Sequence, residues 1–297
     1  MRVILVAMPC PASTAALQAL LDAGHEVAAI VLPAPGHAAP IAWSRPPGAP
    51  RGLPLAGPPT VTGIAARAGI PVALHADPTN PDARALLAPL GADAFVVACY
   101  PRRLPASFVA IAPRGGINIH PSALPALRGP EPLFHALRLG LERTAVTVHV
   151  LTARFDAGPI LAKAPYDFPP GARLHEIEAA TGALGGALAA QALDDLAAGR
   201  AHPVAQDERL ATAAPIPTAA DFRVPTAWSA RRAYAFVRAV AELGGPLRLI
   251  TTDGGDLPIR DAFAWAPDSP DRLPPAPPST SPVDAPFAGG WVRFFRK

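Results

Sequence analysis

The sequence predicts an α/β fold with a large first domain and a smaller second one. Buried-strand runs alternate with amphipathic segments over the first half of the chain, which is the pattern of βαβ units around a mostly parallel sheet. The 297 residues exceed the usual size of a single hydrophobic core, and 50% of them are hydrophobic, which is enough for two cores. We expect a first domain over residues 1–200, a connector over 201–220 and a small β-rich domain over 221–297.

The first domain opens with a βαβ unit. The run RVILVAM (2–8) is typical of a buried strand, and Ser13 or Thr14 can cap the helix that follows it. Gly24 is a stop signal for that helix, and the next strand is expected over 27–32. Further elements are expected in this order: a helix over 61–68, a strand over 70–74, a helix over 82–90 and a strand over 92–98.

One stretch of the first domain is rich in proline and glycine, from Pro33 to Pro59. It is too long for an ordinary connection between a strand and a helix, so we expect a lid, a binding loop or mobile sequence. Its basic residues are Arg45 and Arg51 alone.

The second half predicts fewer and shorter elements. A helix over 174–196, with apolar residues at helical spacing and Gly199 after it, is expected to pack on the sheet. A helix over 228–245 follows the connector, and short strands are expected around 247–251, 257–263 and 291–295. Residues 267–286, with repeated Pro, Ser and Asp, predict a loop or a flexible insertion.

Composition excludes several classes of site. The two cysteines, Cys10 and Cys99, cannot make a zinc set or a disulfide framework, so we expect a reducing compartment and no metal. The apolar start is only one strand long and predicts neither a signal peptide nor a membrane span, which favours a cytoplasmic protein. The turn after the first strand, MPCPAST, lacks the G-x-G-x-x-G pattern of nucleotide-binding dehydrogenases.

Charge gives nucleic-acid binding no direct support. The net charge is +3 and the pI is about 9.2, but the basic residues form no long stripe.

The most informative segment is GGINIHPSALP (115–125). In a strand, residues two apart point to the same face, so Asn118 and His120 are expected to project together. Pro121 and Pro125 end that strand and leave the pair near its carboxyl end, where open α/β sheets place their chemistry.

A carboxylate completes the predicted site. The run Val146 to Val150 alternates as a half-buried strand, and Thr152 to Pro159 is expected to be a loop that carries Asp156. Asn118 can donate to an oxygen that becomes negative, His120 can move a proton or stabilise the same oxygen, and Asp156 can tune His120. We expect His149 to support the site through hydrogen bonds rather than to perform chemistry.

These residues resemble a known family. Asn118, His120 and Asp156, within NIHPSALPALRGPEP and VTVHVLTARFDAGPIL, resemble the N10-formyltetrahydrofolate-dependent formyltransferases that act on glycinamide ribonucleotide, methionyl-tRNA or sugar nucleotides. The resemblance covers about the first 200 residues and implies a Rossmann-like formyltransferase catalytic domain with Asn118, His120 and Asp156 as the catalytic trio. It also implies a small β-barrel-like domain at the carboxyl end.

The resemblance also implies a place for the folate. The main chain of CYPRRLP (99–105) would line the pteridine pocket, and the candidate contacts are Arg102, Arg103, Leu104, Thr152 and Phe155. N10-formyltetrahydrofolate would be the co-substrate, without a metal or a covalent enzyme intermediate.

The acceptor stays open among three alternatives. The RGPEP loop looks closer to the sugar enzymes and favours a small-molecule or sugar-linked amine. Overall length and the second domain favour methionyl-tRNA, although the stretch 33–59 lacks the basic residues of the tRNA enzymes. The third alternative is a formyl-folate hydrolase or a folate-binding module.

Overall fold

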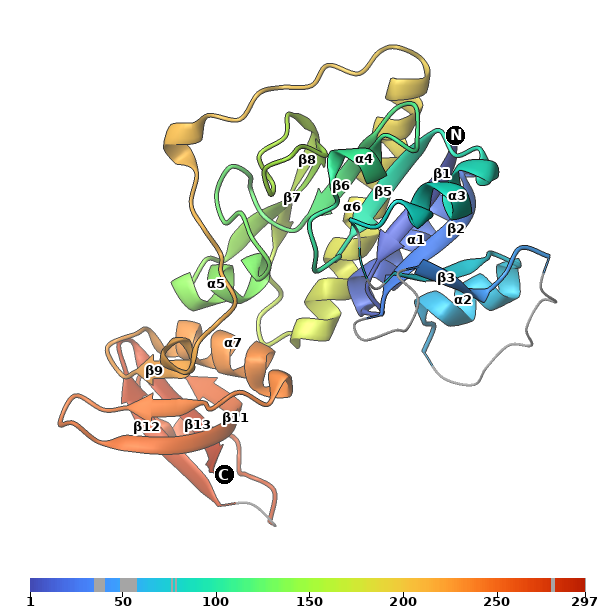
Figure 1. Cartoon of the computed structure of the whole chain (residues 1–297). Helices are drawn as coiled ribbons and strands as arrows, with labels where there is room; N and C mark the ends of the chain where they lie inside the picture. The colour runs from blue at the N-terminus through green and yellow to red at the C-terminus, as the bar shows by residue number, and fades with distance from the viewer. Residues whose placement is uncertain (35–40, 49–57, 76, 78, 279–280, 297) are drawn as a thin grey trace. The chain divides into compact units, whose positions relative to one another are not determined.

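The computed structural model describes residues 1–34, 41–48, 58–75, 77, 79–278 and 281–296 (Figure 1). Contacts divide the chain into two compact units, each of which is assembled from three segments. The first unit comprises Met1–Pro130, Thr144–Tyr166 and Glu178–Ala213, and the second comprises Glu131–Arg143, Asp167–Ile177 and Ala214–Lys297. Residues 201–213 of the predicted connector therefore pack with the first unit.

The first unit is built on a mixed sheet of eight strands in the order β3-β4-β2-β1-β5-β6-β7-β8. The five strands from β4 to β6 in this order run parallel, whereas β3 is antiparallel to β4 and β7 is antiparallel to β6. This arrangement confirms the predicted α/β class. The strands are β1 (Arg2–Ala7), β2 (Glu26–Pro33), β3 (Ile41–Arg45), β4 (Val72–His75), β5 (Ala94–Ala98), β6 (Gly116–His120), β7 (Arg143–Val150) and β8 (Ile160–Asp167).

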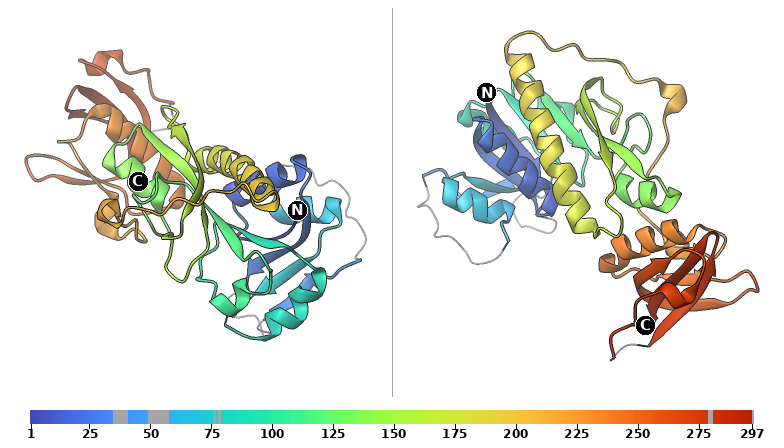
Figure 2. Two further views of the ribbon diagram at one scale, coloured as in Figure 1. Left: turned by 90° about the horizontal axis from the view of Figure 1, so that it is seen from above. Right: turned by 180° about the vertical axis from the view of Figure 1, so that it is seen from behind.

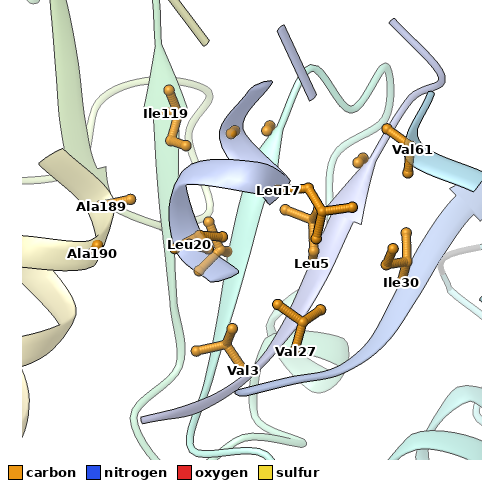
Figure 3. Packing of buried hydrophobic residues seen from close by; sticks show 14 of the residues in the cluster. Val3, Leu5, Leu17, Leu20, Val27, Ile30, Val61, Ile119, Ala189 and Ala190 are labelled. Carbon is orange, nitrogen blue, oxygen red and sulfur yellow. The ribbon is translucent and has the colours of Figure 1, made fainter. Parts of the chain in front are cut away.

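Helices cover both faces of this sheet (Figure 2). On one face, α1 (Pro11–Asp22), α2 (Val61–Ala68) and α6 (Leu174–Ala197) share a buried apolar cluster with the strands. Figure 3 shows Leu17 and Leu20 of α1 packed against the strands, with Ala189 and Ala190 of α6 beside them. On the other face lie α3 (Asp82–Leu87) and α4 (Ala106–Val109).

Small residues allow α6 to approach α1 closely. A Cβ atom added at Gly182 would lie 2.3 Å from the carbonyl oxygen of Ala12, and one at Gly186 would lie 2.8 Å from Cα of Ala16. A Cβ atom at Gly185 would lie 2.2 Å from Cγ2 of Ile119 on β6. The glycines of α6 thus set the distance between this helix and both of its neighbours.

The second unit contains a five-stranded sheet in the order β12-β13-β11-β10-β9, which confirms a second, β-rich part. The aromatic rings of Phe134 and Phe236 meet edge to face at 5.3 Å between centroids, and join α5 to α7 in its core. Its elements are α5 (Pro132–Leu139), β9 (Arg223–Pro225), α7 (Ala230–Val240), β10 (Arg248–Ile250), β11 (Asp256–Ala266), β12 (Pro282–Phe287) and β13 (Gly290–Arg296).

Two predicted loops contain strands. Within the stretch 33–59, β3 pairs antiparallel with β4, while residues 35–40 and 49–57 lie outside the described residues. Within 267–286, β12 pairs with β13. This strand was not predicted because Pro282 and Pro286 lower strand propensity. It forms nevertheless, because β12 is an edge strand and needs hydrogen bonds on one side only.

The other predicted helices and strands are present with shifted ends. The helix expected over 82–90 is α3 followed by a 3₁₀ turn over Ala88–Leu90, and the helix expected over 228–245 is α7 followed by a 3₁₀ turn over Ala241–Leu243. Strand β8 was not predicted. Within the described ranges, no helix is both long and apolar enough to cross a membrane.

Candidate active site

Asn118 and His120 lie at the carboxyl end of β6, between the parallel strand β5 and the antiparallel strand β7. In the register of β6 and β7, Asn118 is opposite His149 and His120 is opposite Thr147. The antiparallel partner therefore brings a second imidazole next to the predicted pair, and all of them lie at the edge where α/β sheets usually place their active sites.

Asp156 lies in the loop after β7 and contacts all three of these side chains. Its Oδ1 atom is 3.2 Å from Asn118 Nδ2, 3.6 Å from His120 Nδ1 and 3.5 Å from His149 Nε2. Its Oδ2 atom accepts a hydrogen bond of 2.9 Å from the backbone N–H of Gly129. The structure thus brings together the three residues that the sequence singled out, and adds His149.

The loop holds Asp156 through an unusual backbone. Asp156 has a φ of 51°, in the left-handed region where residues other than glycine are uncommon. Two residues later, a Cβ atom at Gly158 would lie 1.8 Å from the carbonyl oxygen of Val150, so only glycine fits there. The glycine of the DAGPI sequence is therefore required by the path of the chain past the end of β7.

Backbone carbonyls determine which ring nitrogen of each histidine carries a proton. His149 Nδ1 is 2.9 Å from the carbonyl oxygen of Val150 and must donate to it, which leaves Nε2 to accept from Asn118 Nδ2 at 3.0 Å. His120 Nε2 donates to the carbonyl oxygen of Leu127 at 2.8 Å, so Nδ1 presents its lone pair to Asp156. Both N–H groups of the Asn118 amide are therefore occupied, one by His149 and one by Asp156.

Burial and charge act against one another on His120. Burial lowers the pKa of His120 below its ordinary value, and the attraction of Asp156, which raises it, does not compensate. Burial also acts to raise the pKa of Asp156, but the adjacent side chains of His149 and His120 and the N–H of Gly129 outweigh it and hold that pKa below its ordinary value. At neutral pH the site therefore contains a neutral imidazole facing a carboxylate.

The connector supplies a brace for the Asp156 loop that the sequence did not predict. Gln206 Nε2 donates to the carbonyl oxygens of Asp156 and Gly158 at 2.8 and 2.7 Å. The Oε1 atom of Gln206 accepts from Arg128 at 2.7 Å, and Arg128 also pairs with Glu208 at 3.0 Å. Arg128, in the RGP motif, was the one sequence signal for this brace, because nothing about Gln206 or Glu208 distinguishes them from surface residues.

The structure also places the candidate folate contacts. Arg103 donates to the carbonyl oxygen of Ala153 at 3.4 Å, which joins the segment 99–105 to the loop before Asp156. Leu104 is buried in the core, so its side chain is not available to a ligand. Thr152 donates to the carbonyl oxygen of Arg154, and Phe155 is 58% exposed.

Burial raises the pKa of Tyr100 to about 12 and lowers the pKa of His75, and the charge of Arg102 opposes the first shift and adds to the second. The folate contacts of Arg102, Arg103, Leu104, Thr152 and Phe155 stay predictions. Among the described residues, no group of three or more His, Cys, Asp and Glu side chains could hold a metal ion.

Comparison with known proteins identifies the family. A sequence profile described as formyl transferase matches residues 53–193. Methionyl-tRNA formyltransferase of Acidobacterium capsulatum is 34% identical over 219 residues, which cover 73% of this chain and 67% of that protein. The chain belongs to the formyltransferase family.

Two further comparisons define the extent of the likeness. Methionyl-tRNA formyltransferase of Roseiflexus castenholzii is 41% identical over 160 residues, 54% of this chain and 50% of that protein. The sugar 3N-formyltransferase WlaRD, solved in the presence of dTDP and 5-N-formyl-THF, has the same fold, with a TM-score of 0.65 and 12% identity over 100% of this chain and 98% of that chain. The chain aligns with half to about two thirds of the length of these curated relatives.

Proposed function

We propose that this formyltransferase-family protein transfers a formyl group from N10-formyltetrahydrofolate to an amine. The observation that carries the proposal is that Asn118 and His120 meet Asp156 at the carboxyl end of β6. Asn118 Nδ2 and His120 Nδ1 both lie within 3.6 Å of Asp156 Oδ1. The donor would supply a formyl carbon bound to a nitrogen leaving group. The protein has to stabilise negative charge on the formyl oxygen and move one proton.

His120 is suited to accept the proton of the attacking amine. Its neutral form prevails at neutral pH because burial lowers its pKa, and its Nδ1 lone pair faces Asp156. When Nδ1 takes up a proton, the imidazolium and the carboxylate form an ion pair in a buried site, where such an interaction is strong. Asp156 thereby stabilises the protonated His120 that returns the proton to the departing nitrogen.

Asn118 is suited to stabilise the formyl oxygen, provided that one of its N–H groups changes partner. The contact with Asp156 Oδ1 is the longer one, 3.2 Å compared with 3.0 Å to His149. Once His120 is protonated, Asp156 gains a better partner and the Asn118 N–H is released to a substrate oxygen. The amide would then act as an oxyanion-hole donor as charge develops.

The segments around the cluster fit a folate. The segment 99–105 follows the carboxyl end of β5, and the exposed ring of Phe155 offers an apolar face for a flat heterocycle. Both segments flank Asp156 and are joined by the Arg103–Ala153 hydrogen bond. Arg102, Arg103, Leu104, Thr152 and Phe155 are the residues proposed to hold the donor.

A small-molecule or sugar-linked amine is our first candidate for the acceptor. The second unit contains nearly as many acidic as basic side chains. Its arginines are largely neutralised by acidic partners, in the pairs Arg138–Asp221, Arg173–Asp261, Arg231–Glu142, Arg248–Asp256 and Arg293–Asp284. A surface of this kind offers few free cations to the phosphates of a nucleic acid.

Initiator methionyl-tRNA is the second candidate, and a specific observation favours it. The relatives that match at 34–41% identity are named methionyl-tRNA formyltransferases. The sugar enzyme matches at 12% identity, which supports the fold alone.

A product assay tests the proposal. The pure protein is incubated with N10-formyltetrahydrofolate and, in separate reactions, with initiator methionyl-tRNA, a panel of amino sugars and their nucleotides, or no acceptor. We expect folate release that depends on an amine, with the formyl group recovered on that amine. Formate release at the same rate without any amine would make the protein a hydrolase, and the absence of turnover with every acceptor would leave a folate-binding module.

A further inference from the structure

The two cysteines of the chain lie side by side, although 89 positions separate them in the sequence. Strands β1 and β5 are parallel neighbours with Ala7 opposite Ala98, so the segments that follow both strands leave the sheet at the same edge. Cys10 caps the N-terminus of α1 in one segment, and Cys99 is the first residue after β5 in the other. Ser13 links the two segments, because its hydroxyl contacts Cys10 Sγ and donates to the carbonyl oxygen of Ala98, the residue before Cys99.

A buried serine fixes this arrangement. The hydroxyl of Ser13 donates to the carbonyl oxygen of Ala98 at 2.9 Å and lies 3.3 Å from Cys10 Sγ. Ser13 is fully buried, whereas both cysteines are partly exposed. Cys99 has a φ of 55°, a conformation that residues other than glycine rarely adopt.

The two thiols differ in acidity. The hydrogen bond with Cys99, opposed by burial and assisted by Ser13 and backbone N–H groups, lowers the pKa of Cys10 to about 6. The hydrogen bond to Cys10, burial, the charge of the Cys10 thiolate and that of Glu178 raise the pKa of Cys99. Cys10 is therefore the nucleophile of the pair, and Cys99 holds its proton until it is needed.

We propose that Cys10 and Cys99 are a modification site, a dithiol that is converted reversibly to an intramolecular disulfide by small disulfides such as oxidised glutathione. The Cys10 thiolate attacks one sulfur of the oxidant, a mixed disulfide forms and one small thiolate leaves. Cys99 then loses its proton and attacks Cys10 Sγ, the Cys10–Cys99 bond forms and the second small thiolate leaves. The protein loses two electrons and two protons, and the small disulfide is reduced to two thiols.

The bond would tie the turn after β1 to the segment 99–105. This inference does not depend on the proposed function, because it concerns the thiols alone.

The full-length protein is incubated with increasing ratios of oxidised to reduced glutathione and quenched with acid. Intact mass, free-thiol count and non-reducing electrophoresis are then measured. We expect a monomer that has lost both free thiols and the mass of two hydrogens, and that regains both on treatment with dithiothreitol. With two cysteines in the chain, an intramolecular disulfide can join no other pair.

Two single variants separate the roles of the thiols. Cys99→Ser should accumulate one glutathione adduct, on Cys10, because the resolving thiol is missing. Cys10→Ser should react with oxidised glutathione at about one tenth of the wild-type rate or more slowly, since its remaining thiol, Cys99, is largely protonated. Wild-type protein that keeps both thiols at oxidising ratios, carries two adducts, or forms disulfide-linked dimers would overturn the proposal even if neither variant folds.

Discussion

Asp156 is the residue on which the chemistry of the site depends, since one of its oxygens faces an amide and two imidazoles. Sequence reasoning could find Asn118, His120 and Asp156 because each lies in a recognisable local frame. It could not find which protons these groups hold, because the tautomers follow from the carbonyls of Leu127 and Val150. The neutral state of His120 likewise depends on burial, which only the folded chain determines.

The first prediction concerns the pH dependence of the wild-type protein. In the proposed mechanism His120 acts as a base in its neutral form, and burial lowers its pKa below the ordinary value of 6.5. We therefore expect kcat/KM for formyl transfer to be flat above about pH 6.5 and to fall as pH drops through a pKa below that value. An acid limb centred above pH 7 would show that His120 is not the base that limits the rate.

Replacing Asp156 should change both the turnover of formyl transfer and its pH dependence. Asp156→Asn should lower turnover by about 10²–10³, as expected for loss of an electrostatic or acid–base partner. It should also move the acid limb to lower pH, because the carboxylate is the group that raises the pKa of His120. Circular dichroism serves as the control for folding. A variant with reduced turnover and an unshifted limb would assign Asp156 a role that does not pass through His120.

The brace from the connector gives a third prediction. Gln206→Ala removes the two hydrogen bonds to the Asp156 loop, and displacement of a catalytic group by about 1 Å can cost about 10² in rate. We expect kcat to fall at least tenfold, with a smaller change in the KM for the folate. Arg209→Ala is the matched control, because Arg209 pairs only with Asp207 beside it on the surface. Equal kinetics in the two variants would remove Gln206 from the site.

At the scale of single elements, the close packing of α6 depends on glycines, which have no Cβ atom. Gly182→Ala would place a Cβ atom 2.3 Å from the carbonyl oxygen of Ala12, and backbone cannot move aside as a side chain would. Although alanine gains about 1 kcal/mol of helix propensity, overpacking costs about 1–3 kcal/mol, so we expect a net loss of up to about 2 kcal/mol. Urea unfolding measures this change.

The neighbouring exposed position provides the comparison. Ala183→Gly changes helix propensity alone and should cost about 1 kcal/mol or less. A Gly182→Ala protein that is more stable than the wild type would show that α1 and α6 can separate without cost.

The elements also show where prediction from sequence ends. Strands β1, β2 and β5 were predictable because buried parallel strands are continuous apolar runs. Strands β3 and β12 were hidden by prolines and glycines, because a single sequence does not reveal which strand will be an edge. The segment around Gln206 has no periodicity, so its role is visible only when the connector returns to the first unit.

At the scale of the whole molecule, the distribution of charge leads to a prediction about the two proposed acceptors. Nucleic-acid binding needs free cationic side chains to contact phosphates, and such binding weakens steeply with salt. This chain has 26 basic and 23 acidic residues, and the arginines of its second unit are largely paired with acidic side chains. We expect weak tRNA binding without preference for the initiator species, measured by salt titration of binding alongside formylation of initiator methionyl-tRNA. Tight, initiator-selective binding with efficient formylation would select methionyl-tRNA as the acceptor and leave the catalytic cluster unchanged.

The interleaved path of the chain has a consequence during synthesis. Helix α5 belongs to the second unit, but Phe236, which packs against its Phe134, is translated about 100 residues later, roughly 5–20 s at the usual rate. Phe222, the other phenylalanine that packs against Phe134, is also translated long after α5. A nascent chain that stalls after the proposed catalytic residues have emerged would therefore leave Phe134 without these two rings and expose it to chaperones, with the Asn118 strand already made.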